Sequence, residues 1–133
     1  MLELQEINYQ PSTSEIPILK GLNLKLNSAN PVIIAGESGS GKTSLLEIIS
    51  GLARINSGII KWNKNTLNQR QRRWLCGFVF QFPERHFLGL TISQELKLGH
   101  RRLSTEEQIK ALNKVGLENI NLTQPPENLS GGQ

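Results

Sequence analysis

A short stretch of glycine and serine that ends in lysine and threonine carries the residue types that hold phosphate groups. The run Gly36-Glu-Ser-Gly-Ser-Gly-Lys-Thr matches the pattern G-x-x-x-x-G-K followed by serine or threonine at every fixed position. Glycines let the backbone curl so that its N–H groups face phosphate oxygens, and Lys42 adds a formal positive charge. The Thr43 hydroxyl is an oxygen ligand of the kind that Mg²⁺ prefers. The predicted nucleotide-binding residues are Gly36, Glu37, Ser38, Gly39, Ser40, Gly41, Lys42, Thr43 and Ser44.

The residues on either side of this loop predict the elements that position it. Pro31 is followed by Val32-Ile-Ile-Ala, a β-branched apolar run of the kind that forms a central strand buried on both faces of a parallel sheet. After the loop, leucines and isoleucines recur at helical spacing over 42–52. The loop is therefore expected between a buried strand and the N-terminus of a helix, where the helix dipole favours an anion.

Apolar alternation and capping patterns predict the remaining elements. Thr91 and Ser104 each stand three residues before a Gln or Glu, which is the capping-box pattern of a helix start, and they predict helices near 91–99 and 104–115. Strands are predicted over 2–9, 22–26, 59–62 and 76–81. These elements predict an α/β layer over 1–82 and a small helical layer over 83–133.

Composition limits the classes of protein to consider. The chain has 133 residues, of which 37% are hydrophobic and 12 are glycine, so a globular domain is expected rather than a disordered or fibrous chain. Its N-terminus lacks the pattern of a secretory signal, and no apolar run is long enough to cross a bilayer. The single Cys76 fits a reducing, cytosolic compartment and is expected to be a packing residue. All 11 acidic residues are Glu, which excludes aspartate-dependent chemistry for these 133 residues.

The last five residues separate the possible classes of phosphate-loop protein. Leu129-Ser-Gly-Gly-Gln is the signature pentapeptide of the ATP-binding cassette (ABC) ATPases, and on this resemblance the chain is identified as a member of that family. Gln81, in Phe-Val-Phe-Gln-Phe-Pro, is similar in place to the glutamine that follows the strand after the loop helix in that family. Tyr9 resembles the family's aromatic residue that stacks on adenine. The resemblance implies a P-loop NTPase of α/β class, with an ABC-type core sheet and a helical subdomain, truncated after the signature motif.

The resemblance also implies a role for each matched residue. Ser130, Gly131 and Gly132 would close over the ATP held by a second cassette, which implies a head-to-tail dimer. Gln81 would sense Mg²⁺ and the γ-phosphate and would link the core to the helical layer that docks on transmembrane subunits. The expected location is therefore cytoplasmic and peripheral on the membrane. A plain surface amide is the alternative role for Gln81, and core packing is the alternative role for Tyr9.

The same resemblance predicts what the chain does not contain. The family's strand ending in Asp-Glu follows the signature, and no Asp occurs in this sequence. The first hypothesis is therefore the N-terminal portion of an ABC transporter ATPase that binds ATP and Mg²⁺ without turnover by itself and that has marginal solubility. The stretch after Gln81 resembles cobalt and energy-coupling-factor importers of metal ions or vitamins. The alternatives are a non-catalytic nucleotide-binding module and a soluble ABC ATPase that acts on DNA or ribosomes.

A block of positive charge lies in the middle of the chain. Between Glu47 and Glu84 there are no acidic residues and six basic ones, together with two tryptophans. A nucleic-acid surface would use such cations on phosphates. The alternative is the solvated outer face of an antiparallel β segment that faces an anionic membrane. The second interpretation is the expectation here, and His86 and His100 are not expected to be catalytic.

Overall fold

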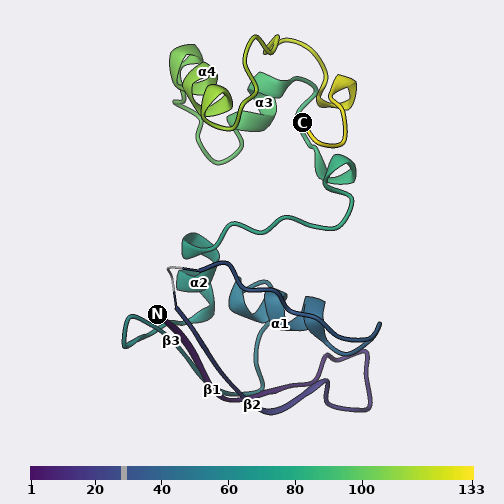
Figure 1. The fold of residues 1–133 in the computed structure, drawn as a ribbon, viewed down its shortest axis with the longest axis vertical. Coiled ribbons are helices and arrows are strands. Elements are labelled where there is room, and N and C mark those ends of the chain that lie inside the picture. The colour runs from purple at the N-terminus through teal and green to yellow at the C-terminus, as the bar shows by residue number, and fades with distance from the viewer. Residues whose placement is uncertain (28–29) are drawn as a thin grey trace. The chain divides into compact units, whose positions relative to one another are not determined.

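A computed structural model describes residues 1–27 and 30–133, and the chain divides into two units, Met1–Phe78 and Val79–Gln133 (Figure 1). In the first unit the order is β1 (Leu2–Tyr9), β2 (Leu19–Leu26), α1 (Lys42–Ile49), β3 (Ser57–Trp62), β4 (Asn65–Thr66) and α2 (Gln69–Leu75). The second unit contains the 3₁₀ turn η1 (Pro83–His86), helices α3 (Ile92–Leu96) and α4 (Thr105–Lys114), and the 3₁₀ turn η2 (Pro126–Asn128). No helix in this described part of the chain has the length and apolarity that a bilayer span requires.

An antiparallel sheet in the order β2-β1-β3-β4 forms the first unit, with α1 packed on it. Leu4 of β1 lies opposite Leu24 of β2 and Ile60 of β3, so apolar side chains from three strands meet in register. α1 contributes its apolar face to the same core, as its helical spacing predicted. The buried core residues are Leu4, Ile7, Leu19, Leu45, Ile48 and Ile60.

A bulge in β1 explains one glycine of β3. Around Glu6 the pairing register of β1 shifts against both of its neighbouring strands, β2 and β3. Glu6 itself has a positive φ of 50°. A Cβ on Gly58 would lie 2.6 Å from the Glu6 carbonyl oxygen, so only glycine allows β3 to approach the bulge. Asn23 stabilises the bulge from β2, because its side-chain oxygen accepts the Glu6 N–H at 3.0 Å.

Two predicted strands are wrong. Residues 31–37 and 76–80 form no strand, and Ile33 and Val79 are 90% and 82% exposed. The apolar composition that favours a buried strand is present in both segments. A strand also needs hydrogen-bonded neighbours, and no described strand pairs with either segment. The observed sheet is therefore antiparallel throughout, without the parallel central strand that the sequence predicted.

Helix α2 was not predicted. Part of the basic block lies on this helix, whereas the block was expected on an antiparallel β segment. The Asn68 side chain accepts the Gln71 N–H at 2.9 Å, and the Gln71 side chain accepts the Asn68 N–H at 2.8 Å. This is a capping box with asparagine in place of serine or threonine. Arg70, Arg72 and Arg73 consequently lie on a helix rather than on a β segment.

The second unit is built around α3 and α4. Thr91 accepts the Gln94 N–H at 3.2 Å at the start of α3, and the Ile92 N–H donates to the Gln124 carbonyl at 3.0 Å. This bond ties the loop that precedes η2 to the first turn of α3. Gln108 of α4 is fully buried and donates to the Leu103 carbonyl at 3.1 Å. The two predicted helix starts at Thr91 and Ser104 are confirmed, although α3 is shorter than predicted.

We expect the Ser104→Ala variant to destabilise α4 by about 1 kcal/mol, the usual cost of losing an N-cap hydroxyl. The Ser104 hydroxyl accepts the Glu107 N–H at 3.2 Å, and the Glu107 carboxylate accepts the Ser104 N–H at 2.8 Å. Hydrogen bonding of the carboxylate to Ser104, chiefly from its backbone N–H and also from its side chain, holds the pKa of Glu107 below its ordinary value. Its contribution to stability is therefore complete above the unfolded-state pKa and is lost as the pH falls through the folded-state pKa. Urea unfolding followed by circular dichroism at neutral and acidic pH measures both effects.

The matched control is Ser104→Asn, which retains a side-chain acceptor at the N-cap. An NMR titration of Glu107 should give a pKa nearer its ordinary value in the alanine variant than in the asparagine variant, because alanine keeps the backbone N–H that donates to the carboxylate but loses the side chain of the N-cap. Equal pKa values in the two variants would show that the cap does not set the Glu107 titration.

Candidate nucleotide-binding site

The side chain of Lys42 bridges two backbone carbonyls of the loop that precedes α1. The Lys42 Nζ donates to the carbonyl oxygens of Gly36 at 2.9 Å and Glu37 at 2.6 Å. The Ser40 N–H also donates to the Glu37 carbonyl, at 3.2 Å. An ammonium group has three donors, so one Lys42 donor is left for a ligand oxygen after these two bonds.

Glycine is required where the loop enters α1. Gly41 is the N-cap residue and has φ 90°, a backbone conformation that a side chain strains. A Cβ at this position would also lie 2.8 Å from the Cγ2 atom of Ile18. The chain before β2 therefore packs directly against the loop, and a larger residue at position 41 would displace one of the two.

The first turn of α1 is open to an anion. No side chain caps this end of α1, and its first turn has no acidic residue. A pocket of about 370 Å³ lies here, lined by Ile18, Ser38, Gly39, Gly41, Lys42, Thr43 and Ser44. Backbone N–H groups without partners, the positive end of the helix dipole and the Lys42 ammonium together favour a polyanion such as a nucleotide phosphate chain.

The donor set at this pocket fits Mg²⁺ only together with a bound phosphate. The Thr43 hydroxyl lies in the first turn of α1 and is exposed. No group of three His, Cys or Glu side chains that could hold a metal exists in the described residues. From the residues that line this pocket, a magnesium ion would therefore take one hydroxyl oxygen, and phosphate and water oxygens would be needed among its other ligands.

Tyr9 and Ile18 are joined by a backbone hydrogen bond, but only Ile18 lines the pocket at α1. The Ile18 N–H donates to the Tyr9 carbonyl at 2.8 Å at the start of β2. Tyr9 is half-buried against the core, and it is not among the described residues that line the pocket at α1. Ile18 does line that pocket, although the sequence analysis did not select it. An isoleucine in a loop carries no motif, so only its contact with Gly41 reveals it.

Gln81 belongs to the second unit and lies in a segment whose aromatic and basic side chains contact one another. Phe80 and His86 stack with their ring centroids 4.6 Å apart, and the Arg85 guanidinium lies 4.9 Å from the centroid of the Phe82 ring. The ring contacts leave the Gln81 side chain exposed. His86 is thus a stacking partner of Phe80 in this segment.

Glu95 orders the chain between this segment and α3. Its carboxylate accepts the N–H groups of Leu88 at 2.9 Å and Gly89 at 2.7 Å. A Cβ on Gly89 would lie 2.5 Å from the Glu95 backbone nitrogen, so the loop approaches α3 closely. No motif in the sequence indicates this role for Glu95. A lone glutamate in the first turn of a helix indicates a favourable dipole interaction but does not identify the loop that it binds.

The signature residues form a turn at one end of the second unit. The Ser130 N–H donates to the Gln133 side-chain oxygen, and the Gln133 N–H donates to the Ser130 carbonyl, both at 2.9 Å. A Cβ on Gly131 or Gly132 would meet nothing within 4 Å. The packing of this unit therefore does not require either glycine, and their backbone is open to an approaching group. The surrounding pocket of about 460 Å³ is lined by Phe87, Pro126, Glu127, Leu129, Ser130, Gly131, Gly132 and Gln133.

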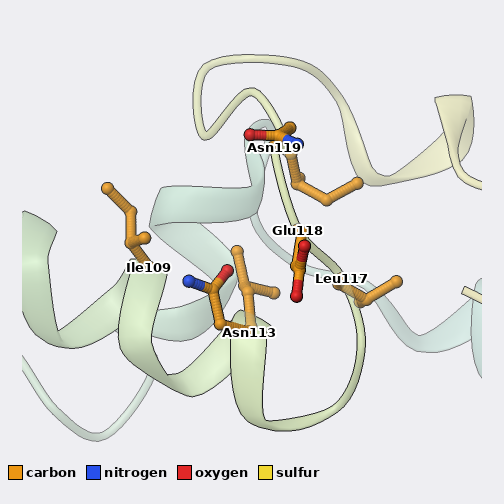
Figure 2. A pocket seen from close by; sticks show the side chains of 7 residues that line it. Ile109, Asn113, Leu117, Glu118 and Asn119 are labelled. Carbon is orange, nitrogen blue, oxygen red and sulfur yellow. The ribbon is translucent and has the colours of Figure 1, made fainter.

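A further pocket of the second unit has a different chemistry. It lies at the C-terminal end of α4, has a volume of about 250 Å³, and includes the Glu118 carboxylate and the Asn113 and Asn119 amides (Figure 2). Ile109 and Leu117 also line it. No cation lies among its lining residues, and the Glu118 carboxylate would repel a phosphate chain.

The loop at α1 has the sequence pattern of the P-loop class of nucleotide-binding proteins. Residues 19–133 match the family described as ABC transporter. The chain is 34% identical to ABC transporter I family member 11, chloroplastic, of Arabidopsis thaliana, over 98% of this chain and 53% of that protein. It is 31% identical to the energy-coupling factor transporter ATP-binding protein EcfA of Enterococcus faecium, over 100% of this chain and 51% of that protein. The chain thus spans about half the length of these relatives.

Solved structures show the same relationship. The chain is similar to cbiO1 from Clostridium perfringens, part of the ABC transporter complex cbiONQ, with a TM-score of 0.78 and 26% identity over 97% of this chain and 55% of that one. It is also similar to the dimeric bacterial ABC transporter cassette MJ0796, with a TM-score of 0.76 and 27% identity over 100% of this chain and 65% of that one. The chain therefore belongs to the ABC transporter family and carries the N-terminal part of its P-loop NTPase fold.

Proposed function

We propose that this chain is the nucleotide-binding portion of an ABC transporter ATP-binding subunit and that it binds ATP with Mg²⁺ at the loop before α1. The open first turn of α1 beside the Lys42 ammonium carries this proposal. Backbone N–H groups of 36–44 would surround the phosphates, and the third donor of Lys42 would reach an outer phosphate oxygen. Tyr9 would stack on the adenine ring after a small movement from its half-buried position.

Mg²⁺ would be held by the Thr43 hydroxyl, with Gln81 as a second contact when the nucleotide is bound. The ion would neutralise charge on the phosphate chain, which is what Mg²⁺ supplies in phosphoryl transfer. Lys42 and the helix dipole would orient the phosphates. The Glu37 backbone carbonyl accepts from the Lys42 ammonium, and the Glu37 side chain is exposed.

The signature residues would act on the nucleotide of a second cassette. Ser130, Gly131 and Gly132 present an open turn that its own unit does not fill. MJ0796, a similar cassette, is dimeric, and a second structure of it is a post-hydrolysis state bound to ADP and Pi. The two structures of MJ0796 support a dimer, and its proposed arrangement is head to tail, with each signature turn facing the loop of the other subunit.

Transmembrane subunits are the proposed partners of residues 83–133, which would form the helical layer beside a core of 1–82. The relatives include ATP-binding proteins of energy-coupling factor transporters and LolD of a lipoprotein-releasing system, 36% identical over 95% of this chain and 60% of that protein. The stretch after Gln81 favours the energy-coupling-factor type, with a metal ion or vitamin as the transported solute. The complete subunit would then be cytoplasmic and would lie on the membrane through its partners.

The Lys42→Ala variant tests the nucleotide site directly. Calorimetric titration of the chain with MgATP should give an affinity about 10- to 100-fold weaker for the variant, because a charge-assisted hydrogen bond to a phosphate is lost. Lys25→Ala is the matched control, since Lys25 is an exposed cation on β2. Equal affinities in the wild type and the Lys42 variant would refute the proposal.

A further inference from the structure

The pocket around the signature turn (129–133) is lined by two separate segments of the second unit. Phe87, which follows η1, supplies one lining side chain, and residues between 126 and 133 supply the others. Pro126 is buried, whereas Phe87 is 40% exposed. The shape of this pocket therefore depends on how the two segments are held relative to one another within the unit.

The segment that leads into the signature turn is bound by the backbone of α3. The Ile92 N–H donates to the Gln124 carbonyl at 3.0 Å, and the Ser93 N–H donates to the Leu122 carbonyl at 2.9 Å. Both donors belong to the first turn of α3, where N–H groups have no partner within the helix. This turn thus fixes one side of the pocket through its backbone.

The loop after η1 is bound by side chains of the same helical turn. The Glu95 carboxylate accepts the N–H groups of Leu88 at 2.9 Å and Gly89 at 2.7 Å. The Gln94 side-chain oxygen accepts the next N–H, that of Leu90, at 2.8 Å. Hydrogen bonds to a carboxylate are about twice as strong as those between neutral groups, so Glu95 provides most of this attachment.

Apolar burial does not hold this loop in place. Leu88 and Leu90 are each 80% exposed, so their side chains contribute little packing. The loop nevertheless approaches α3 so closely that a Cβ on Gly89 would lie 2.5 Å from the Glu95 backbone nitrogen. The hydrogen bonds to Glu95 therefore determine where the loop lies, and with it the position of Phe87, the residue directly before it.

We infer that Glu95 is a positioning residue for the signature turn. Its carboxylate fixes the loop that carries Phe87, and Phe87 forms one wall of the pocket that contains Gly131 and Gly132. The use of this turn on the nucleotide of a second cassette rests on the proposed function, whereas the positioning itself needs no nucleotide. In that use, a misplacement of about 1 Å can lower the rate by about 100-fold. Glu95 would thus affect hydrolysis by a pair of cassettes without contacting the nucleotide.

NMR spectra of the full 133-residue chain without nucleotide test this inference. Phe87→Leu removes the aromatic ring, so it shows in which direction the amide shifts of Gly131 and Gly132 move when the ring leaves the pocket. In Glu95→Ala the same amides should shift in the same direction, because the loop is released. Glu95→Gln keeps an uncharged acceptor and should give smaller shifts of the same sign.

Thr91→Ala is the matched control, because it removes the N-cap hydroxyl of the same helix and leaves the Glu95 carboxylate in place. It should destabilise α3 but leave the amides of Gly131 and Gly132 at their wild-type shifts. Unchanged amides in Glu95→Ala would overturn the inference. Equal shifts in the Thr91 variant would also overturn it, because the stability of α3 would then set the pocket.

Two features keep this experiment decisive. If Glu95→Ala does not fold, the comparison of Glu95→Gln with Thr91→Ala gives the same decision, since the glutamine variant retains a hydrogen-bond acceptor. Because no nucleotide is present, a chain that fails to bind MgATP can still give either result. Failure of the proposed function and failure of this inference are therefore distinguishable.

Discussion

The 133-residue chain is expected to bind MgATP without hydrolysing it above the rate of its Lys42→Ala variant. Phosphoryl transfer needs a group that orients the attacking water, in addition to phosphates held in place. The sequence has no Asp, whereas the resemblance to ABC ATPases implies an Asp-Glu pair for this step. No group of three acidic, His or Cys side chains that could hold a metal ion occurs in the described residues. Loss of a general base alone costs about 10²- to 10⁴-fold in rate.

Phosphate release during a long incubation with MgATP measures this result. The Lys42→Ala chain, purified in the same way, gives the background from contaminating ATPases. Binding by the wild type without turnover would support a nucleotide-binding portion that needs further residues for catalysis. Mg²⁺-dependent hydrolysis that the Lys42 variant abolishes would show that a residue within these 133 orients the water.

Local patterns predicted the elements whose partners are close in the sequence. β1 has its predicted bounds, and α4 begins at the predicted cap, because alternation and the capping box of Ser104 are properties of a few consecutive residues. The loop before α1 was found in the same way from the spacing of its glycines and Lys42. That this loop binds ATP stays a prediction for the titration to decide.

The elements that depend on distant partners could not be predicted. Residues 32–35 have the composition of a central strand, yet they form none, because strand formation is decided by neighbours and not by composition. α2 was missed because its Arg-rich sequence shows no apolar stripe. The contact of Ile18 with Gly41 likewise joins residues 23 positions apart, which no motif describes.

Arg72 is the clearest case of a residue whose role only the structure reveals. Its side chain is 3% exposed, and its Nε donates to the Ile48 carbonyl at 3.0 Å. Its Nη1 donates to the Leu67 carbonyl at 3.2 Å. The last turn of α1 contains no basic residue of its own. A cation from α2 therefore interacts with the negative end of the α1 dipole, and burial lowers the pKa of Arg72 without discharging it.

Replacing Arg72 with alanine is expected to destabilise the first unit by about 2–3 kcal/mol. Hydrogen bonds from a charged donor contribute about 1.5–3 kcal/mol each, and their loss is partly offset because a buried charge no longer needs to be desolvated. The Ile48 carbonyl keeps the Gly51 N–H at 3.1 Å, so the Leu67 carbonyl is the acceptor that loses its donor. Arg72→Lys should restore only part of the stability, because an ammonium lacks the fork that reaches both carbonyls.

Urea unfolding followed by tryptophan fluorescence reports on the first unit alone, since Trp62 and Trp74 both belong to it. Arg70→Ala is the matched control, because it removes the same charge from an exposed position of α2 and should change the free energy of unfolding by less than about 0.5 kcal/mol. Equal unfolding midpoints for the Arg70 and Arg72 variants would contradict this role of Arg72. A loss of stability confined to the Arg72 variants would show that Arg72 stabilises the fold, whereas the exposed cations of the basic block do not.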